Sequence, residues 1–332
     1  MASLRPSEEM CSRAPGSFFQ CSYGRVHYRL LGSAERALPL VVCLHGISAE
    51  GAAYLPLVQD HLLPLGFQCL LPDFYGRGWS DSADKHVHND VHLFTSQLAE
   101  LLLGVAPLTA HQSVTSIYLI GSSMGGAIAT RFTHLHPELV KKLVLVCPAG
   151  LPMPSNALHT MVIKVPGMGE ALLSMASKKS IAEAASRSYF DVAGREGAKQ
   201  HLERTLKRGE ELAKHHPMSI KSLINTVRNF NFGGLTESFR AVGENERVKV
   251  LLVWGDKDVV VPFENHAKCL EVMKREVTFV KLEDAGHVDM FAVPHIQEIF
   301  HRAVVEHFQK DEEAQEDKDG KGKGKEQGPT AP

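Results

Sequence analysis

Gly121-Ser122-Ser123-Met124-Gly125 places a serine between two glycines, at the junction of an apolar segment and a helix-forming segment. Residues 116–120 (SIYLI) predict a buried parallel strand, and residues 126–132 (GAIATRF) predict a helix. A turn this tight imposes unusual backbone dihedral angles on Ser123 and brings neighbouring backbone close, which requires glycine on both sides. The pattern is typical of a serine whose hydroxyl acts as a nucleophile, with Ser122 filling the turn.

An activated serine needs a base and a carboxylate, and the sequence offers both downstream. Residues 248–254 (VKVLLVW) predict a strand whose following loop carries Asp258, and residues 277–282 (VTFVKL) predict a strand whose following loop carries His287. Parallel strands gather ligands at their carboxyl edge, so we expect Ser123, Asp258 and His287 to meet there. The chain order serine, aspartate, histidine agrees with this architecture.

The fourth expected component is an oxyanion hole, formed by backbone amides. Residues 40–44 (LVVCL) predict an early strand that ends in a turn beginning His45-Gly46-Ile47. We expect the amide of Ile47 to pair with the amide of Met124, the residue after the nucleophile. His45 is interpreted as a packing and hydrogen-bonding residue of this turn and not as a proton carrier.

These motifs together resemble those of the alpha/beta-hydrolase superfamily, over roughly residues 15–309. The supporting segments are residues 45–46 (HG), 73–81 (DFYGRGWSD), 137–145 (PELVKKLVL) and 254–258 (WGDKD). The resemblance implies an α/β fold with a mostly parallel eight-stranded sheet, helices on both faces and an inserted helical cap. It also implies a serine hydrolase that needs no metal or organic cofactor.

Within the superfamily, residues 123–126 (SMGG) and 146–151 (VCPAGL) are similar to the monoacylglycerol-lipase-like branch. They are also similar to hydrolases that cleave carbon–carbon bonds in ring-fission products. The first similarity implies a serine esterase or lipase acting on lipophilic esters. The second implies a cationic site for a substrate carboxylate, for which Arg187, Arg195 and Arg228 are candidates. A protein that kept the pocket but lost the chemistry is a third alternative, from another functional class.

Several acidic residues compete with Asp258 for the role of the catalytic acid. Asp256 lies in the same loop, but the superfamily pattern places the acid three residues after the strand-ending glycine, which favours Asp258. Asp284 and Asp289 flank His287 in sequence and are interpreted as loop-forming or solvated residues.

The string His86, His88, Asp90 and His92 approaches a zinc-binding pattern. A zinc site needs further ligands, and nothing else in the chain is spaced to supply them. We therefore expect no metal site here, and a helix that starts near Asp84.

The domain organisation follows from where strands and helices stop alternating. We expect a disordered N-terminus over 1–15, a hydrolase core over 16–150 and 246–309, a helical cap over 151–245 after the sixth strand, and a disordered charged tail over 310–332. The apolar stretch 161–175 in the cap has three interpretations: the buried side of a helix, an acyl-chain tunnel, or a patch that dips into a membrane surface.

The composition limits the classes of partner and the cellular compartment that we expect. The hydrophobic content of 44% suffices for a large core, and the net charge of -2 without a basic stripe argues against a nucleic-acid partner. Six cysteines without a C-x-x-C motif suit a reducing compartment. No signal peptide and no membrane-spanning run is recognised, so we expect a cytoplasmic protein. An alternative is a cytoplasmic protein whose cap contacts a membrane surface. The expected partner is a small-molecule ester or lipid substrate. No pattern indicates an oligomeric state.

Overall fold

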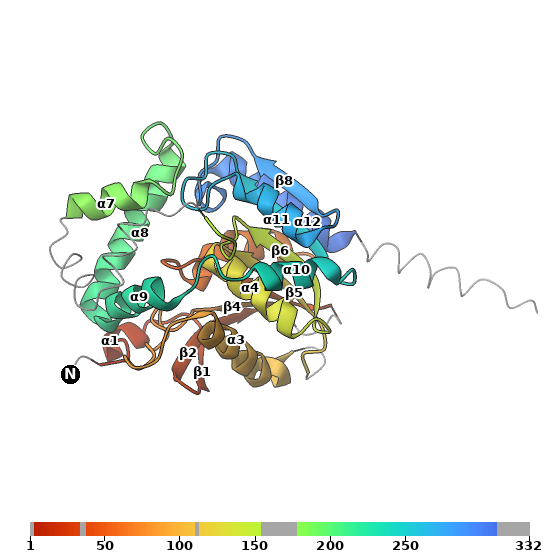
Figure 1. Cartoon of the computed structure of the whole chain (residues 1–332). Coiled ribbons are helices and arrows are strands. Elements are labelled where there is room, and N and C mark those ends of the chain that lie inside the picture. The colour runs from red at the N-terminus through yellow and green to blue at the C-terminus, as the bar shows by residue number, and fades with distance from the viewer. Residues whose placement is uncertain (1–2, 34–37, 110–112, 154–177, 311–332) are drawn as a thin grey trace, which may run out of the picture.

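The computed structural model describes residues 3–33, 38–109, 113–153 and 178–310, and its centre is a single eight-stranded sheet (Figure 1). The strand order is β1-β2-β4-β3-β5-β6-β7-β8. The strands are β1 (Ser17–Cys21), β2 (Gly24–Leu31), β3 (Leu40–Leu44), β4 (Cys69–Pro72), β5 (Ile117–Ser122), β6 (Val140–Val146), β7 (Lys249–Gly255) and β8 (Thr278–Leu282). The predicted fold class is confirmed.

The sheet is parallel except at one edge. β2 pairs antiparallel with both β1 and β4, whereas all pairs from β4 to β8 are parallel. The strand order reverses at β3, which lies between β4 and β5. A reversal of this kind opens a crevice at the carboxyl ends of the strands, where open α/β sheets bind ligands.

The central strands are continuous apolar runs because both of their faces are covered. All residues of β3, β4 and β5 are buried. Helix α4 packs on β3, β5 and β6, and helix α12 packs on β7 and β8. The core helical segments are η1 (Gly51–Tyr54), α2 (Leu55–Leu57), η2 (Val58–Leu62), α3 (Val91–Val105), η3 (Ala106–Leu108), α4 (Met124–Leu135), α10 (Thr236–Glu244), α11 (Asn265–Met273), η4 (Asp289–Phe291) and α12 (Pro294–Gln309).

A buried lysine fixes the last helix. Lys142 in β6 is 2% exposed, and its Nζ donates to the carbonyls of His307 and Phe308 at 2.9 and 2.8 Å. These carbonyls belong to the last turn of α12, where helical acceptors lack partners within the helix. A positive charge at a helix C-terminus also interacts favourably with the helix dipole.

Described helices follow β6 in the segment for which the sequence predicts a cap. Three of them, α7 (Lys178–Ser186), α8 (Glu196–His215) and α9 (Met218–Asn229), lie together to one side of the sheet (Figure 1). The predicted cap boundary at residue 245 is wrong for α10, which packs against α4 and α11. Phe239 and Val242 are buried in this contact region, so α10 belongs to the core layer. Part of the predicted cap, residues 154–177 with the whole apolar stretch 161–175, lies outside the described residues.

The prediction of disorder for residues 1–15 is wrong where the structure describes them. A short helix, α1 (Glu8–Cys11), begins after Ser7, whose hydroxyl accepts from the amide of Met10 at 3.2 Å. Met10 is 1% exposed, and the Ser7 amide donates to the carbonyl of His215 at the end of α8. These contacts span about two-thirds of the chain, so the local composition gave no sign of them. The predicted tail beyond residue 310 lies outside the described residues.

One helical segment, Val91–Leu108, is long and apolar enough to cross a membrane, with a mean hydropathy of 1.3. The sequence interpretation recognised no such run. In the fold, half of this segment is buried, and α3 packs against α4 and β1. A core helix covering a sheet has this burial pattern.

Candidate active site

Ser123 occupies a strained turn between β5 and α4. Its backbone angles are φ 54° and ψ −118°, a conformation that residues with a side chain rarely adopt. Three amides, those of Gly126, Ala127 and Ala149, donate to the Ser123 carbonyl at 3.0–3.2 Å, and the Ser123 amide donates to Val146. The surrounding backbone therefore over-determines a conformation that costs about 1–3 kcal/mol, which is typical of functional sites.

Two glycines allow this turn because of the backbone that lies against them. A Cβ on Gly121 would come within 2.4 Å of the Gly125 carbonyl oxygen, and a Cβ on Gly125 would come within 2.2 Å of the Leu44 carbonyl oxygen. Distances below 3.0 Å cannot be accommodated without moving backbone. Glycine is required here for close approach of α4 to β3 and β5.

Asp258 and His287 meet across the loops that follow β7 and β8. The Nδ1 atom of His287 lies 2.7 Å from Oδ2 of Asp258, and the two residues are 8% and 4% exposed. The other carboxylate oxygen, Oδ1, accepts from the amides of Val260 and Val261 at 2.8 and 3.0 Å. The carboxylate is thus held in one orientation, and Nδ1–H donates to it, so the second ring nitrogen is free to accept a proton.

The rival acid Asp256 points to other partners. Its carboxylate lies 3.2 Å from Nζ of Lys257 and accepts from the amide of Ala285. Burial alone would raise the pKa of Asp256, but the hydrogen bonds with Lys257 and with the amide of Ala285, together with the charge of Lys257, outweigh it and lower the pKa. Of the two carboxyl groups in this loop, Asp258 is the one that contacts His287.

The predicted oxyanion turn lies directly against Ser123. A Cβ on Gly46 would be 3.5 Å from the Ser123 Cβ and 4.0 Å from its Oγ. In the described part of the chain, neither the amide of Ile47 nor that of Met124 donates to another protein group. The Ser123 hydroxyl likewise makes no hydrogen bond to a described residue, and catalytic hydrogen bonds often tighten only when substrate is present.

His45 holds the turn as a neutral imidazole. Its Nε2 accepts from the amide of Phe74 at 3.0 Å, and its Nδ1 lies 2.7 Å from the carbonyl oxygen of Gly46. The first contact requires an unprotonated Nε2, and the second requires a proton on Nδ1. Burial lowers the pKa of His45 to about 4. The packing role predicted for His45 agrees with these contacts.

Buried neutral histidines make the fold sensitive to acid. Burial lowers the pKa values of His45, His216 and His301 to about 4. An unfolded histidine takes up its proton below about pH 6.5, so the unfolded state binds more protons and stability falls as the pH drops from about 6.5 towards about 4. We expect each imidazole to lower the free energy of unfolding by about 2 kcal/mol between pH 7 and pH 5.

Urea unfolding at a series of pH values measures this loss. Replacing His301 by glutamine is expected to remove about 2 kcal/mol of the acid-induced loss, because it removes one of the imidazoles whose pKa is lowered to about 4. His88 is exposed, and His88→Gln serves as the matched control with an unchanged pH profile. Equal stability of the wild-type chain at pH 7 and pH 5 would contradict the prediction.

Asp289 is a structural residue of the site. The sequence alone is compatible with a loop-forming or a solvated role, and the structure shows the loop-forming role. It is fully buried, and its Oδ2 accepts from the amides of Gly286 and Phe190 at 2.7 and 2.8 Å. Burial raises its pKa. The amide of Val288 also donates to the carbonyl of Ser188. The loop that carries His287 is therefore attached to the segment that follows α7. In the sequence, the only sign of this structural role was that Asp289 lies two residues after His287.

Cys147 lies beside the dyad and was not expected there. Its Sγ, an Asp258 oxygen and a His287 nitrogen lie within 4.8 Å of one another, the one such group of potential metal ligands in the described ranges. Burial raises the pKa of the Cys147 thiol. Two ligands of one tetrahedral zinc ion are separated by about 3.3 Å. The 2.7 Å contact between Asp258 and His287 fits a shared proton better than a shared metal.

The histidine string before α3 is a helix-capping segment. Asp90 is the N-cap of α3, and its Oδ1 accepts from the amide of Leu93 at 2.9 Å. The predicted helix start near Asp84 is wrong, because the cap lies six residues later. The three histidines of the string are exposed.

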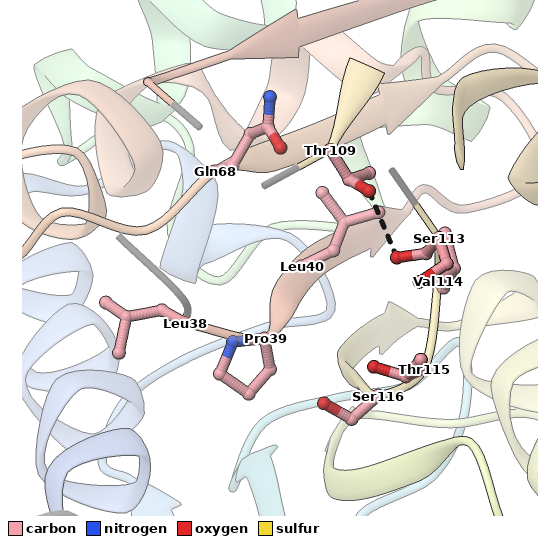
Figure 2. A pocket seen from close by; sticks show the side chains of 9 residues that line it. All are labelled: Leu38, Pro39, Leu40, Gln68, Thr109, Ser113, Val114, Thr115 and Ser116. Atoms are coloured by element: carbon pink, nitrogen blue, oxygen red, sulfur yellow. Dashed lines mark hydrogen bonds between the residues drawn. The ribbon is translucent and has the colours of Figure 1, made fainter. Parts of the chain in front are cut away.

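Two hollows lie away from these residues. Figure 2 shows the first, a cavity of about 20 Å³ lined by residues that precede β3 and β5, such as Pro39 and Ser116. This volume holds about one water molecule, and it lies at the amino ends of the strands, opposite Ser123. The second, a groove of about 470 Å³, runs along β2 past Tyr28 and Leu30. Neither contains a predicted site residue.

A family model described as the alpha/beta hydrolase fold matches residues 39–292, more than half of the chain. The 2-hydroxy-6-oxononadienedioate/2-hydroxy-6-oxononatrienedioate hydrolase of Escherichia coli is 26% identical over 277 residues, covering 79% of this chain and 84% of that protein. Monoacylglycerol lipase abhd6-B of Xenopus laevis is 32% identical over 135 residues, covering 38% of this chain and 35% of that protein. The solved esterase of Exiguobacterium antarcticum has a TM-score of 0.69 at 20% identity, covering 89% of this chain and all of that one, a likeness of fold.

Proposed function

The chain belongs to the alpha/beta hydrolase family, and we propose that it is a serine hydrolase that cleaves lipophilic carboxylic esters such as monoacylglycerols. The observation that carries the proposal is the 2.7 Å contact between Nδ1 of His287 and the carboxylate of Asp258, whose other oxygen accepts from two backbone amides. This pair lies at the carboxyl edge of the sheet, the edge where Ser123 occupies a strained turn. A local similarity to a monoacylglycerol lipase supports the ester class.

The proposed mechanism uses only groups of the chain. Ser123 attacks the ester carbonyl while Nε2 of His287 accepts its proton, and Asp258 stabilises the imidazolium that forms. The amides of Ile47 and Met124 donate to the oxyanion, each worth roughly 3–4 kcal/mol in the transition state. The alcohol leaves with the proton from His287, and water then hydrolyses the acyl-enzyme on Ser123 by the same steps.

Carbon–carbon bond hydrolysis of a ring-fission product is the second candidate. It is favoured by the similarity to the Escherichia coli hydrolase, because that alignment covers most of both chains. Of the three cap arginines considered for a substrate carboxylate, Arg195 donates to the carbonyl of Asp284 in the loop that carries His287. This contact attaches a cation to the loop that carries the proposed base. Arg187 is exposed, and Arg228 is half-buried in α9.

Turnover of two substrates separates the candidates. We expect kcat/KM for a monoacylglycerol to exceed that for a vinylogous diketo acid by about a hundredfold or more, because a pocket shaped for an alkyl chain leaves the acid's carboxylate unpaired. Arg195→Gln is the discriminating variant, since it lowers kcat/KM for the diketo acid only if Arg195 binds that carboxylate. The opposite preference, with loss of diketo acid turnover in Arg195→Gln, would establish the second candidate.

The remaining alternative is a non-catalytic protein, and turnover of either substrate would exclude it.

All six cysteines are free, with Cys11 half-buried and the other five buried. We accordingly propose a reducing, cytoplasmic location, with the cap as the part that would contact a membrane. The apolar stretch on which that contact depends, residues 161–175, lies outside the described residues.

A further inference from the structure

Arg77, in the loop after β4, is a buried cation that connects the cap to the oxyanion turn. It is 3% exposed. Its guanidinium donates to four oxygens: the carbonyls of Ile47 (3.0 Å) and Tyr75 (2.9 Å) and the hydroxyls of Ser222 (3.1 Å) and Thr226 (2.8 Å). Ser222 and Thr226 lie one turn apart on α9, and Ile47 is the residue whose amide is proposed to bind the oxyanion. The side chain of Arg77 therefore contacts both cap helix α9 and the oxyanion turn.

Arg77 forms no ion pair with the part of the chain that the structure describes. Among the described residues, no carboxylate oxygen lies within 4.0 Å of its nitrogens, whereas Arg5, Arg13 and Arg25 each have one. Burial lowers the pKa of Arg77. Desolvating a buried charge costs several kcal/mol, roughly, and no ion pair among the described residues offsets that cost for Arg77. A cost of this size is consistent with a role other than stability.

The positive charge also reaches the turn. Burial is the main cause of the lowered pKa of His45, the residue that precedes Gly46 in the turn, and the charge of Arg77 adds to this lowering. A fixed cation near a forming oxyanion stabilises it without reorganisation, since the protein has already oriented the dipoles and charge. Arg77 therefore acts on the turn in two ways, through the Ile47 backbone and through its charge.

The cap end of this connection is itself fixed. Asn89, in the loop before α3, is 2% exposed and donates through Nδ2 to the carbonyl and the hydroxyl of Ser222. Its amide donates to Oδ1 of Asn225 on the same helix. Ser222 and Thr226 thus present their hydroxyls to Arg77 from a helix that is held in register with the core. A shift of α9 would be transmitted to Arg77 directly.

We propose that Arg77 is a positioning residue that fixes the Ile47 backbone against cap helix α9, so that docking of the cap and formation of the oxyanion hole are coupled. The inference rests on the proposed function, because it assigns the Ile47 amide to the oxyanion. It adds a residue and a physical link to that site, since the cap then affects the rate of the chemical step as well as access of the substrate.

The test separates kcat from KM for hydrolysis of p-nitrophenyl butyrate. We expect Arg77→Met to lower kcat about 100-fold, close to the loss of one oxyanion donor, with KM changed less than about threefold. Arg77→Lys keeps the charge but loses the fork of donors, and we expect a loss of about tenfold. The double variant Ser222→Ala/Thr226→Val leaves the bond to Ile47 intact and is expected to lower kcat about fivefold.

A second readout is the affinity for a trifluoromethyl ketone, which forms a tetrahedral oxyanion with the serine. It should weaken in parallel with kcat, because both depend on the oxyanion hole. The matched control is Lys142→Met, which removes another buried cation that donates to backbone carbonyls, at the amino end of β6. We expect it to lower the melting temperature and to leave kcat of the folded enzyme unchanged.

The outcomes are distinguishable. Lower melting temperatures with unchanged kcat and unchanged ketone affinity, in the Arg77 variants and the cap double variant alike, would show a merely structural role and overturn the inference. Should Arg77→Met fail to fold, Arg77→Lys and the double variant decide by the same readouts. A wild-type chain that hydrolyses no ester would overturn the proposed function together with this inference, whereas an active wild type with fully active variants would overturn the inference alone.

Discussion

Replacing Ser123 by alanine is expected to lower ester turnover by about a million-fold while the protein stays folded. The hydroxyl is the atom that forms the acyl-enzyme, and the members of such a triad act as a unit, so losing one removes nearly the whole effect. The variant keeps its turn, because the surrounding amides that bind the Ser123 carbonyl involve backbone only. Steady-state hydrolysis of p-nitrophenyl butyrate measures the loss, and circular dichroism with thermal unfolding measures the fold.

The matched control for Ser123 is its neighbour. Ser122 is the last residue of β5, buried in the strand, and it precedes the turn. We expect Ser122→Ala to change turnover less than about fivefold, because surface or strand substitutions outside the chemistry act mainly through stability. A Ser123→Ala variant with full esterase activity would refute the assignment of the nucleophile.

Replacing Asp258 by asparagine is expected to lower kcat by about ten-thousand-fold with little change in KM. The carboxylate accepts from Nδ1 of His287 at 2.7 Å and thereby leaves Nε2 unprotonated. An asparagine can present its amide donor to Nδ1, which favours the tautomer with the proton on Nε2 and blocks acceptance of the serine proton. Stopped-flow and steady-state kinetics of ester hydrolysis, in the pH range where the wild type is fully active, measure the loss.

Asp256 gives the control in the same loop. Its carboxylate contacts Lys257 and the amide of Ala285. We expect Asp256→Asn to change kcat less than about threefold, because it lies outside the pair with His287. The account would be contradicted if Asp256→Asn were the damaging substitution and Asp258→Asn were neutral.

The sheet could be predicted from the sequence because buried parallel strands are continuous apolar runs. Residues 40–44 correspond to β3 as predicted, and the run 248–254 differs from β7 by one residue at each end. Loops at the carboxyl ends of such strands must converge, and the structure brings Asp258 and His287 together there. Their catalytic roles stay predictions until the variants above are measured.

Long-range packing could not be predicted from local pattern. The amphipathic pattern of α10 predicts a buried face but does not say whether the cap or α4 covers it. Helix α1 depends on a contact with His215, more than 200 residues away. Arg77 was visible only as part of a motif, because its partner Ser222 follows 145 residues later. Residues that connect cap and core therefore carry no local signal.

The most direct measurement of the central claim is the site at which a fluorophosphonate reacts. We predict one adduct per chain, located by peptide mass mapping on Ser123, formed rapidly by the wild type and absent from Ser123→Ala. The reaction should be strongly slowed in Asp258→Asn, because the phosphonylation uses the same base. An adduct on another residue, or no adduct on a folded wild-type chain, would contradict the account.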